Sequence, residues 1–234
     1  MNSAPVVAVA AGRGGAGASV AAASLALAAA DAGSRVLIVD VDEGGSGLDL
    51  VLGVEETPGV RWPGLVSLTE PVPTEELMSV LPMLGGLSVV SVDRDAVPIP
   101  AVAVAAVLAT ARAAVDLIVV DVARGKTEAA AAAYEFAAHG LIVVPAEARA
   151  TVSATVLGNQ LRGLLPDLRL LVRGPAPAGL DAQVVAEIVG LPLAGSVRAE
   201  PGLDAALEYG DVPRPRGPLR RFCREYLDEL EGAP

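Results

Sequence analysis

Residues 5–20, PVVAVAAGRGGAGASV, join a short apolar run, a glycine-rich turn and the start of an alanine-rich helix. The run Val6 to Ala11 is continuously apolar, as a buried central strand of a parallel sheet requires. The loop from Gly12 to Gly17 carries few side chains, so its backbone can curl closely around a ligand. Because Ser19 opens the helix, the free N–H groups of the loop and the helix dipole converge on one point. We therefore predict a phosphate-binding loop here.

Two phosphate-binding patterns align with this loop. The Walker A pattern G-x-x-x-x-G-K-[ST] places Gly12 and Gly17 at its glycines, but Ala18 stands where its lysine belongs. The dinucleotide fingerprint G-x-G-x-x-G aligns with Gly12, Gly14 and Gly17, and Asp40 follows at the end of the next predicted strand, where a ribose-binding carboxylate belongs. The loop alone leaves both patterns open.

Three segments in a fixed order favour the first pattern, because together they resemble the motifs of the MinD/ParA family of bacterial positioning ATPases. RGGAGAS, residues 13–19, resembles the deviant Walker A motif K-G-G-x-G-K-[ST], with Arg13 and Ala18 in place of its two lysines. VLIVDVDEGGSGLDLVLG, residues 36–53, resembles the first switch segment of the family. LIVVDVARG, residues 117–125, resembles the strand of the second switch.

Within this family the chain is most similar to the CpaE-like subgroup, related to TadZ and to the septum site-determining protein Ssd. The segments that carry this likeness are GVRWPGL (59–65), VPAEARA (144–150) and RGPAPAGLDAQ (173–183). The resemblance covers almost the whole chain and implies a homodimer whose partners belong to the Tad/Flp pilus secretion machinery or to septum placement. CpaE-like relatives often carry an N-terminal receiver-like domain. Here the loop begins within fifteen residues of Met1, so we expect that this domain is absent or that the chain is a fragment.

The resemblance also implies a role for each matching residue, because in the family ATP sits between two subunits. Asp42 would position the attacking water, and Arg13 would reach the nucleotide of the partner subunit. Ser19 would ligate Mg²⁺ directly, while Asp40 and Asp121 would act on it through water. The residues implied to bind ATP or ADP are Gly12, Gly14, Gly15, Ala16, Gly17, Ala18, Ser19 and, near the adenine, Arg173.

The absence of the Walker A lysine determines how much ATP binding and hydrolysis we expect. Losing one charge-assisted contact costs roughly 1.5 to 3 kcal/mol of binding, so nucleotide binding can survive. Hydrolysis is more sensitive, because a cation on the transferred phosphate can accelerate the step by on the order of a thousandfold. We therefore expect weak or absent turnover. One alternative is an active ATPase in which Arg13 or Lys126 compensates. Another is a dinucleotide-dependent oxidoreductase with His139, Lys126 or Tyr134 as its catalytic residue.

Composition limits the remaining possibilities. The net charge of -11 argues against strong DNA binding. The longest candidate for a membrane span, Ala101 to Val120, is interrupted by Arg112 and Asp116, so we expect no integral membrane segment. The N-terminus lacks an export signal, which predicts a cytoplasmic protein that partners could recruit to the pole, the septum or the inner membrane face. Cys223, the single cysteine, is expected to fill a small apolar space.

Helical and strand patterns alternate along all 234 residues, which predicts one α/β domain. We expect a doubly wound, mostly parallel sheet of about seven or eight strands with helices on both faces. Thr74 is predicted to cap a helix, and His139 to end one. Irregular structure is expected over residues 53–73, with Trp62 packed under that loop. A proline-rich connector, residues 210–218, should lead to an amphipathic helix, 219–231, that docks on the domain.

Overall fold

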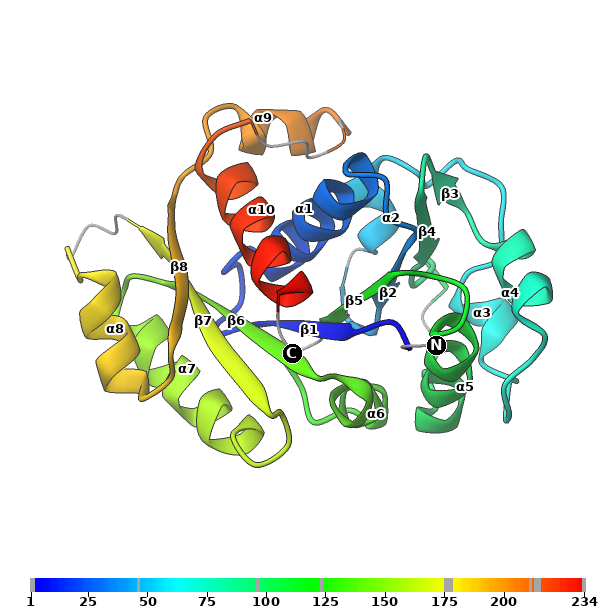
Figure 1. The fold of residues 1–234 in the computed structure, drawn as a ribbon, viewed down its shortest axis with the longest axis horizontal. Helices are drawn as coiled ribbons and strands as arrows, with labels where there is room; N and C mark the ends of the chain where they lie inside the picture. The colour runs from blue at the N-terminus through cyan, green and yellow to red at the C-terminus, as the bar shows by residue number, and fades with distance from the viewer. Residues whose placement is uncertain are drawn as a thin grey trace.

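The computed structural model describes residues 3–45, 47–95, 97–122, 124–174, 179–210, 212 and 216–232. They form one eight-stranded sheet in the order β3-β4-β2-β5-β1-β6-β7-β8 (Figure 1). Only the pairing of β3 with β4 is antiparallel. The predicted doubly wound, mostly parallel sheet is therefore confirmed. The strands are β1 (Val6–Ala11), β2 (Val36–Asp40), β3 (Met83–Leu84), β4 (Leu87–Val90), β5 (Leu117–Val122), β6 (His139–Pro145), β7 (Asp167–Gly174) and β8 (Leu193–Arg198).

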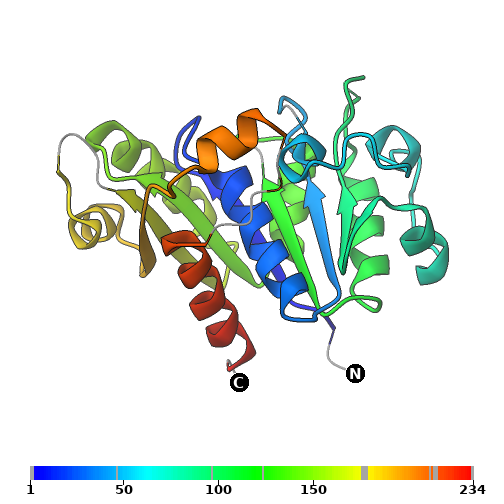
Figure 2. The same ribbon diagram turned by 90° about the horizontal axis from the view of Figure 1, so that it is seen from above.

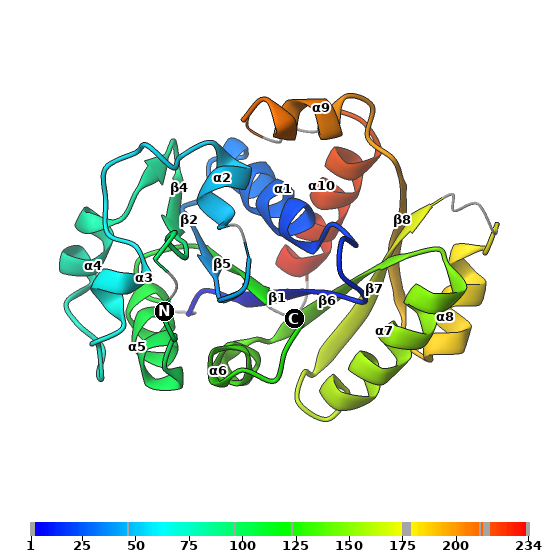
Figure 3. The ribbon, with the colours of Figure 1, turned by 180° about the vertical axis from the view of Figure 1, so that it is seen from behind.

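Helices cover both faces of the sheet, and two separate apolar cores lie between the layers. The first face carries α1 (Ala18–Asp31), α2 (Leu48–Leu52) and α10 (Pro218–Glu231). Figure 3 shows α7 (Ala148–Leu161) and α8 (Ala182–Val189) on the opposite face from α10. Figure 2 shows α9 (Leu203–Glu208) at the end of the sheet towards which the strands run. The second face carries α3 (Trp62–Leu65), α4 (Thr74–Val80), α5 (Ala101–Ala111), α6 (Glu128–Phe136), α7 (Ala148–Leu161) and α8 (Ala182–Val189).

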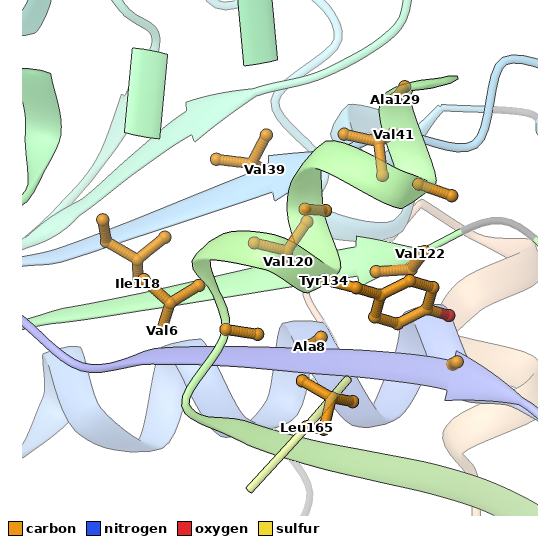
Figure 4. Close-up of a cluster of buried hydrophobic side chains, with 14 of the residues drawn as sticks. Val6, Ala8, Val39, Val41, Ile118, Val120, Val122, Ala129, Tyr134 and Leu165 are labelled. Carbon is orange, nitrogen blue, oxygen red and sulfur yellow. The ribbon is translucent and has the colours of Figure 1, made fainter. Parts of the chain in front are cut away.

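The continuous apolar run of β1 is explained by its central position, because both of its faces are buried. Val6 and Ala8 point into the core under α6, together with Ile118 and Val120 of β5 (Figure 4). Val7 and Val9 belong to the core on the other face. Alanine, the best helix former, makes up most of α1, and its small side chain lets that helix lie close to the sheet.

The strand order reverses at β1. From β1 the chain builds β2 and β4 on one side and returns to β5 beside β1, and it then builds β6, β7 and β8 on the other side. Ligands of open α/β sheets bind at such a switch point, beyond the carboxyl ends of the strands. The loop that follows β1 lies at this point.

The C-terminal helix docks on the domain, as predicted. Phe222, Cys223 and Tyr226 of α10 are buried against α1 and β8. Burial raises the pKa of the Cys223 thiol to about 12, so this side chain is an apolar filler. Among the described residues no helix is long and apolar enough to span a bilayer. Of the predicted connector, residues 211 and 213–215 lie outside the described part of the chain.

Several local predictions were wrong. Pro73 rather than Thr74 occupies the N-cap of α4, and the Thr74 hydroxyl instead donates to the carbonyl of Thr110. Because α6 already ends at Phe136, His139 is not a helix end but the first residue of β6. Its Nδ1 lies 2.9 Å from Oδ2 of Asp167.

The stretch 53–73, predicted to be irregular, contains the short helix α3. Its Trp62 is fully buried under the loop, as expected, and cannot present a partner surface. The edge strand β3 was not predicted at all.

Candidate functional site

The glycine loop, residues 12–17, folds as a compact turn at the carboxyl end of β1. Gly15 and Gly17 have φ angles of 69° and 90°, a region that favours glycine. Gly12 donates to the carbonyl of Val143 at 2.8 Å, and a Cβ at Gly12 would lie 3.1 Å from Val144 and 3.2 Å from Ala154. The glycines therefore serve two needs, the turn itself and close packing on β6.

Helix α1 starts directly after this turn. It begins at Ala18, one residue before the predicted start at Ser19, with Gly17 as its N-cap. No side chain caps this end, so the first N–H groups can bind an anion. Ala18 is buried and brings a methyl group to the position at which the Walker A pattern has its lysine.

Two carboxylates lie at the ends of neighbouring strands beside the loop. Asp40 of β2 and Asp121 of β5 are register partners and only 2% and 4% exposed. Burial raises the pKa of Asp121 to about 7, with a further rise from the charge of Asp40, while a hydrogen bond from the Ser19 side chain lowers it. Burial likewise raises the pKa of Asp40 to about 6. The predicted metal residues Ser19, Asp40 and Asp121 thus lie together.

Asp40 also organises the segment that follows β2. Its Oδ1 accepts the N–H of Asp42 and its Oδ2 accepts the N–H of Leu48, both at 2.9 Å. The Ser91 hydroxyl of the neighbouring segment donates to the same Oδ2 at 3.5 Å and accepts the N–H of Asp49. The carboxylate therefore holds the start of α2, a structural task that is independent of any metal. The sequence patterns gave no sign of Ser91.

Of the two residues predicted to be catalytic, Asp42 adjoins this pair, and its charge raises the pKa of both Asp40 and Asp121. Asp42 is partly exposed and accepts the N–H of Gly44 at 3.2 Å. Arg13 is held within its own chain, because its Nη2 lies 3.0 Å from Oε2 of Glu147 and its Nη1 donates to the carbonyl of Gly14 at 2.8 Å. Glu147, the N-cap residue of α7, was not recognised in the sequence, and nothing in its local pattern indicates this contact.

Arg173 lies against the glycine loop. Its Nη1 donates to the carbonyl of Ala16 at 2.8 Å. A Cβ at Gly17 would lie only 2.5 Å from the same nitrogen, so a larger residue there would push the guanidinium away from the loop. The sequence predicted a contact with the adenine for this residue. The observed contact is with the loop that would surround the phosphates.

A pocket opens between this loop and the end of the sheet. Gly17 and Arg173 lie at the loop side, and apolar side chains of β7, β8 and α9 form its walls, among them Leu171, Val197 and Leu203. The pocket offers apolar contacts next to free N–H groups and a cation, which suits a ligand with a ring system and an anionic tail.

The residues proposed for the alternative oxidoreductase do not gather at this site. His139 starts β6, at the opposite end of the sheet from the loop. Tyr134 is buried in the core beneath α6 (Figure 4), and Lys126 is exposed.

Comparison with known proteins places this geometry in a family. A family model named ParA, with the description NUBPL iron-transfer P-loop NTPase, matches residues 2–156. The chain belongs to the ParA family of P-loop NTPases. This ParA-family chain is also 40% identical over 198 residues to the uncharacterized protein Rv3660c of Mycobacterium tuberculosis H37Rv. The match covers 84% of the chain but only 57% of the length of that relative.

Solved structures confirm the ParA/MinD fold. A ParA family ATPase from Chlorobium tepidum superposes with a TM-score of 0.86 at 17% identity, covering 97% of this chain and 99% of the other. The septum site-determining protein MinD of Pyrococcus horikoshii, complexed with Mg-ADP, gives a TM-score of 0.73 at 17% identity, covering 97% and 96%.

Proposed function

We propose that this ParA-family chain binds ATP or ADP with Mg²⁺ at the glycine loop and hydrolyses ATP weakly or not at all. The observation that carries this proposal is a complete backbone cradle without its lysine. The turn at Gly15 and Gly17 and the uncapped start of α1 are intact, whereas Ala18 brings no charge. Backbone N–H groups supply much of the phosphate binding, and the missing cation matters most in the transition state.

The metal residues fit this proposal. The Ser19 hydroxyl lies close enough to Asp121 to lower the pKa of its carboxyl, and Asp40 is the register partner of Asp121. A hydroxyl and carboxylates are the oxygen ligands that Mg²⁺ prefers, and the ion would neutralise both buried charges. The related MinD of P. horikoshii was solved with Mg-ADP, which supports the same ligand here.

The cellular role we propose is that of a positioning protein of the CpaE/TadZ/Ssd type. It would act as a homodimer that locates partner proteins of the pilus secretion machinery or of the division septum. The family membership and the MinD-like fold support this role. Asp42 would position the attacking water in the residual reaction, and Arg13 would be the cation for the partner subunit.

The experiment is calorimetric titration of the chain with ADP and with ATP, each with and without Mg²⁺, while phosphate release is followed on the same sample. A18K, which restores the family lysine, is the positive control. We expect Mg²⁺-dependent binding by the natural chain and faster phosphate release only in the variant. No binding at millimolar nucleotide would contradict nucleotide binding. Phosphate release by the natural chain that is lost in Asp42→Ala would identify an active ATPase.

A further inference from the structure

The guanidinium of Arg173 supplies a positive charge to the glycine loop from a different part of the chain. Arg173 lies near the end of β7, and β6 separates that strand from β1. Its Nη1 donates to the carbonyl of Ala16 at 2.8 Å and lies 2.5 Å from the place that a Cβ on Gly17 would take, so the guanidinium covers Gly17 closely. This contact joins residues 157 positions apart in the sequence.

The charge lies beside Gly17, the residue before the position at which the loop lacks a lysine. Ala18 follows Gly17 directly and occupies the lysine position of the Walker A pattern. The arginine within the loop itself, Arg13, is paired with Glu147. Arg173 has no ion-pair partner among the described residues, so its charge is not neutralised by a carboxylate there.

The same side chain borders the pocket beside the loop. Leu171 and Val197 form apolar walls, and Arg173 lies where this wall meets Gly17. A ligand whose ring packs on the apolar walls would direct an anionic tail past the guanidinium towards the start of α1. A guanidinium presents several N–H groups in a plane, so one can remain on Ala16 while others bind phosphate oxygens.

We propose that Arg173 replaces the missing P-loop lysine as the cation that binds the phosphates of the nucleotide. This inference rests on the proposed nucleotide binding and assigns that task to a residue outside the loop. The anchor on Ala16 orients the guanidinium before the ligand arrives, which lowers the entropy cost of binding.

The test is a cycle of variants titrated with Mg-ADP by calorimetry. The variants are R173A, A18K and the double variant A18K/R173A. R224A, which removes an exposed arginine from α10, is the matched control. Losing a charge-assisted contact should weaken ADP binding about ten- to a hundredfold in R173A, and R224A should stay within about threefold of the natural chain. A18K should recover most of the loss in the double variant while improving the natural chain much less.

The rescue separates a phosphate-binding role from a structural one. If Arg173 only holds the loop in shape, A18K cannot restore binding in the double variant, and the inference is overturned. It is also overturned if A18K raises affinity by the same factor with and without Arg173. If R173A binds ADP as tightly as the natural chain, this inference is refuted, but the proposed nucleotide binding is not. No ADP binding by the natural chain overturns both.

Discussion

Asp40 and Asp121 are register partners on adjacent parallel strands, and both carboxylates are buried beside the glycine loop. Burial raises the pKa of both, and the charge of Asp40 raises the pKa of Asp121 further. Two buried carboxylates at the ends of adjacent strands cost stability unless a cation neutralises their charge. This pair therefore links the pH dependence of the fold to the proposed Mg²⁺ site.

The first prediction concerns Asp121→Asn. The pKa of Asp121 is about 7 in the folded chain and about 3.9 in the unfolded chain, so the folded state binds more protons between these values. The free energy of unfolding should therefore fall as the pH rises from about 4 to 7. Asp121→Asn should flatten this decline and raise stability at pH 8 by on the order of 2 kcal/mol.

Urea unfolding at several pH values measures this effect, and Glu70→Gln, an exposed change, is the control. A variant that is less stable than the natural chain at pH 8 would contradict the charge argument.

The second prediction concerns the ion pair between Arg13 and Glu147. Both side chains are more than one-third exposed, so the pair contributes under about 1 kcal/mol to the fold. Glu147→Gln should leave the free energy of unfolding nearly unchanged but free Arg13 to reach a partner subunit. We expect a several-fold tighter dimer with Mg-ATP, measured by sedimentation equilibrium. Adding Arg13→Ala should abolish the gain, whereas an unchanged dimer would show that Glu147 does not restrain Arg13.

The third prediction uses Trp62, the single tryptophan of the chain. The indole is fully buried, and its N–H donates to the backbone carbonyl of Asp40. Mg²⁺ and nucleotide at the neighbouring carboxylates should shift this backbone and change the tryptophan emission. The titration compares Mg-ADP with ADP in the presence of EDTA, and Trp62→Phe supplies the blank. An unchanged spectrum at nucleotide concentrations that saturate the calorimetric signal would disprove the coupling.

The sequence predicted the parts of the fold that local patterns determine. The continuous apolar run of β1 could only be a central strand, and the glycines of the loop could only form a turn. Element ends were less predictable, because tertiary hydrogen bonds set them. His139 was expected to end a helix, but the N–H of the preceding Ala138 donates to the carbonyl of Val6 in β1, which places His139 in β6.

No local sequence pattern indicated the two long-range contacts made by arginines at the candidate site. Arg13 and Glu147 are 134 residues apart, and Ala16 and Arg173 are 157 residues apart. Family resemblance assigned Arg13 to a partner subunit and Arg173 to the adenine, because it transfers roles between matching positions. Such a transfer of roles cannot indicate contacts between distant residues that form only when this chain folds.

The last prediction concerns the docking of α10. The ring of Phe222 packs on Gly195 of β8 so closely that a Cβ there would lie 2.6 Å from it, and it stacks on Tyr226 with a centroid distance of 5.6 Å. Phe222→Ala should lower the free energy of unfolding by about 3 to 5 kcal/mol, because it leaves a cavity under the helix.

Gly195→Ala should also destabilise the natural chain, since the added methyl group collides with the ring. In the Phe222→Ala background the same methyl group would enter the vacated space, so Gly195→Ala should lower the free energy of unfolding by less. Urea unfolding of the two single variants and the double variant measures this coupling, with Val152→Ala on an exposed site as the control. Additive costs would mean that the helix does not rest on Gly195 in solution.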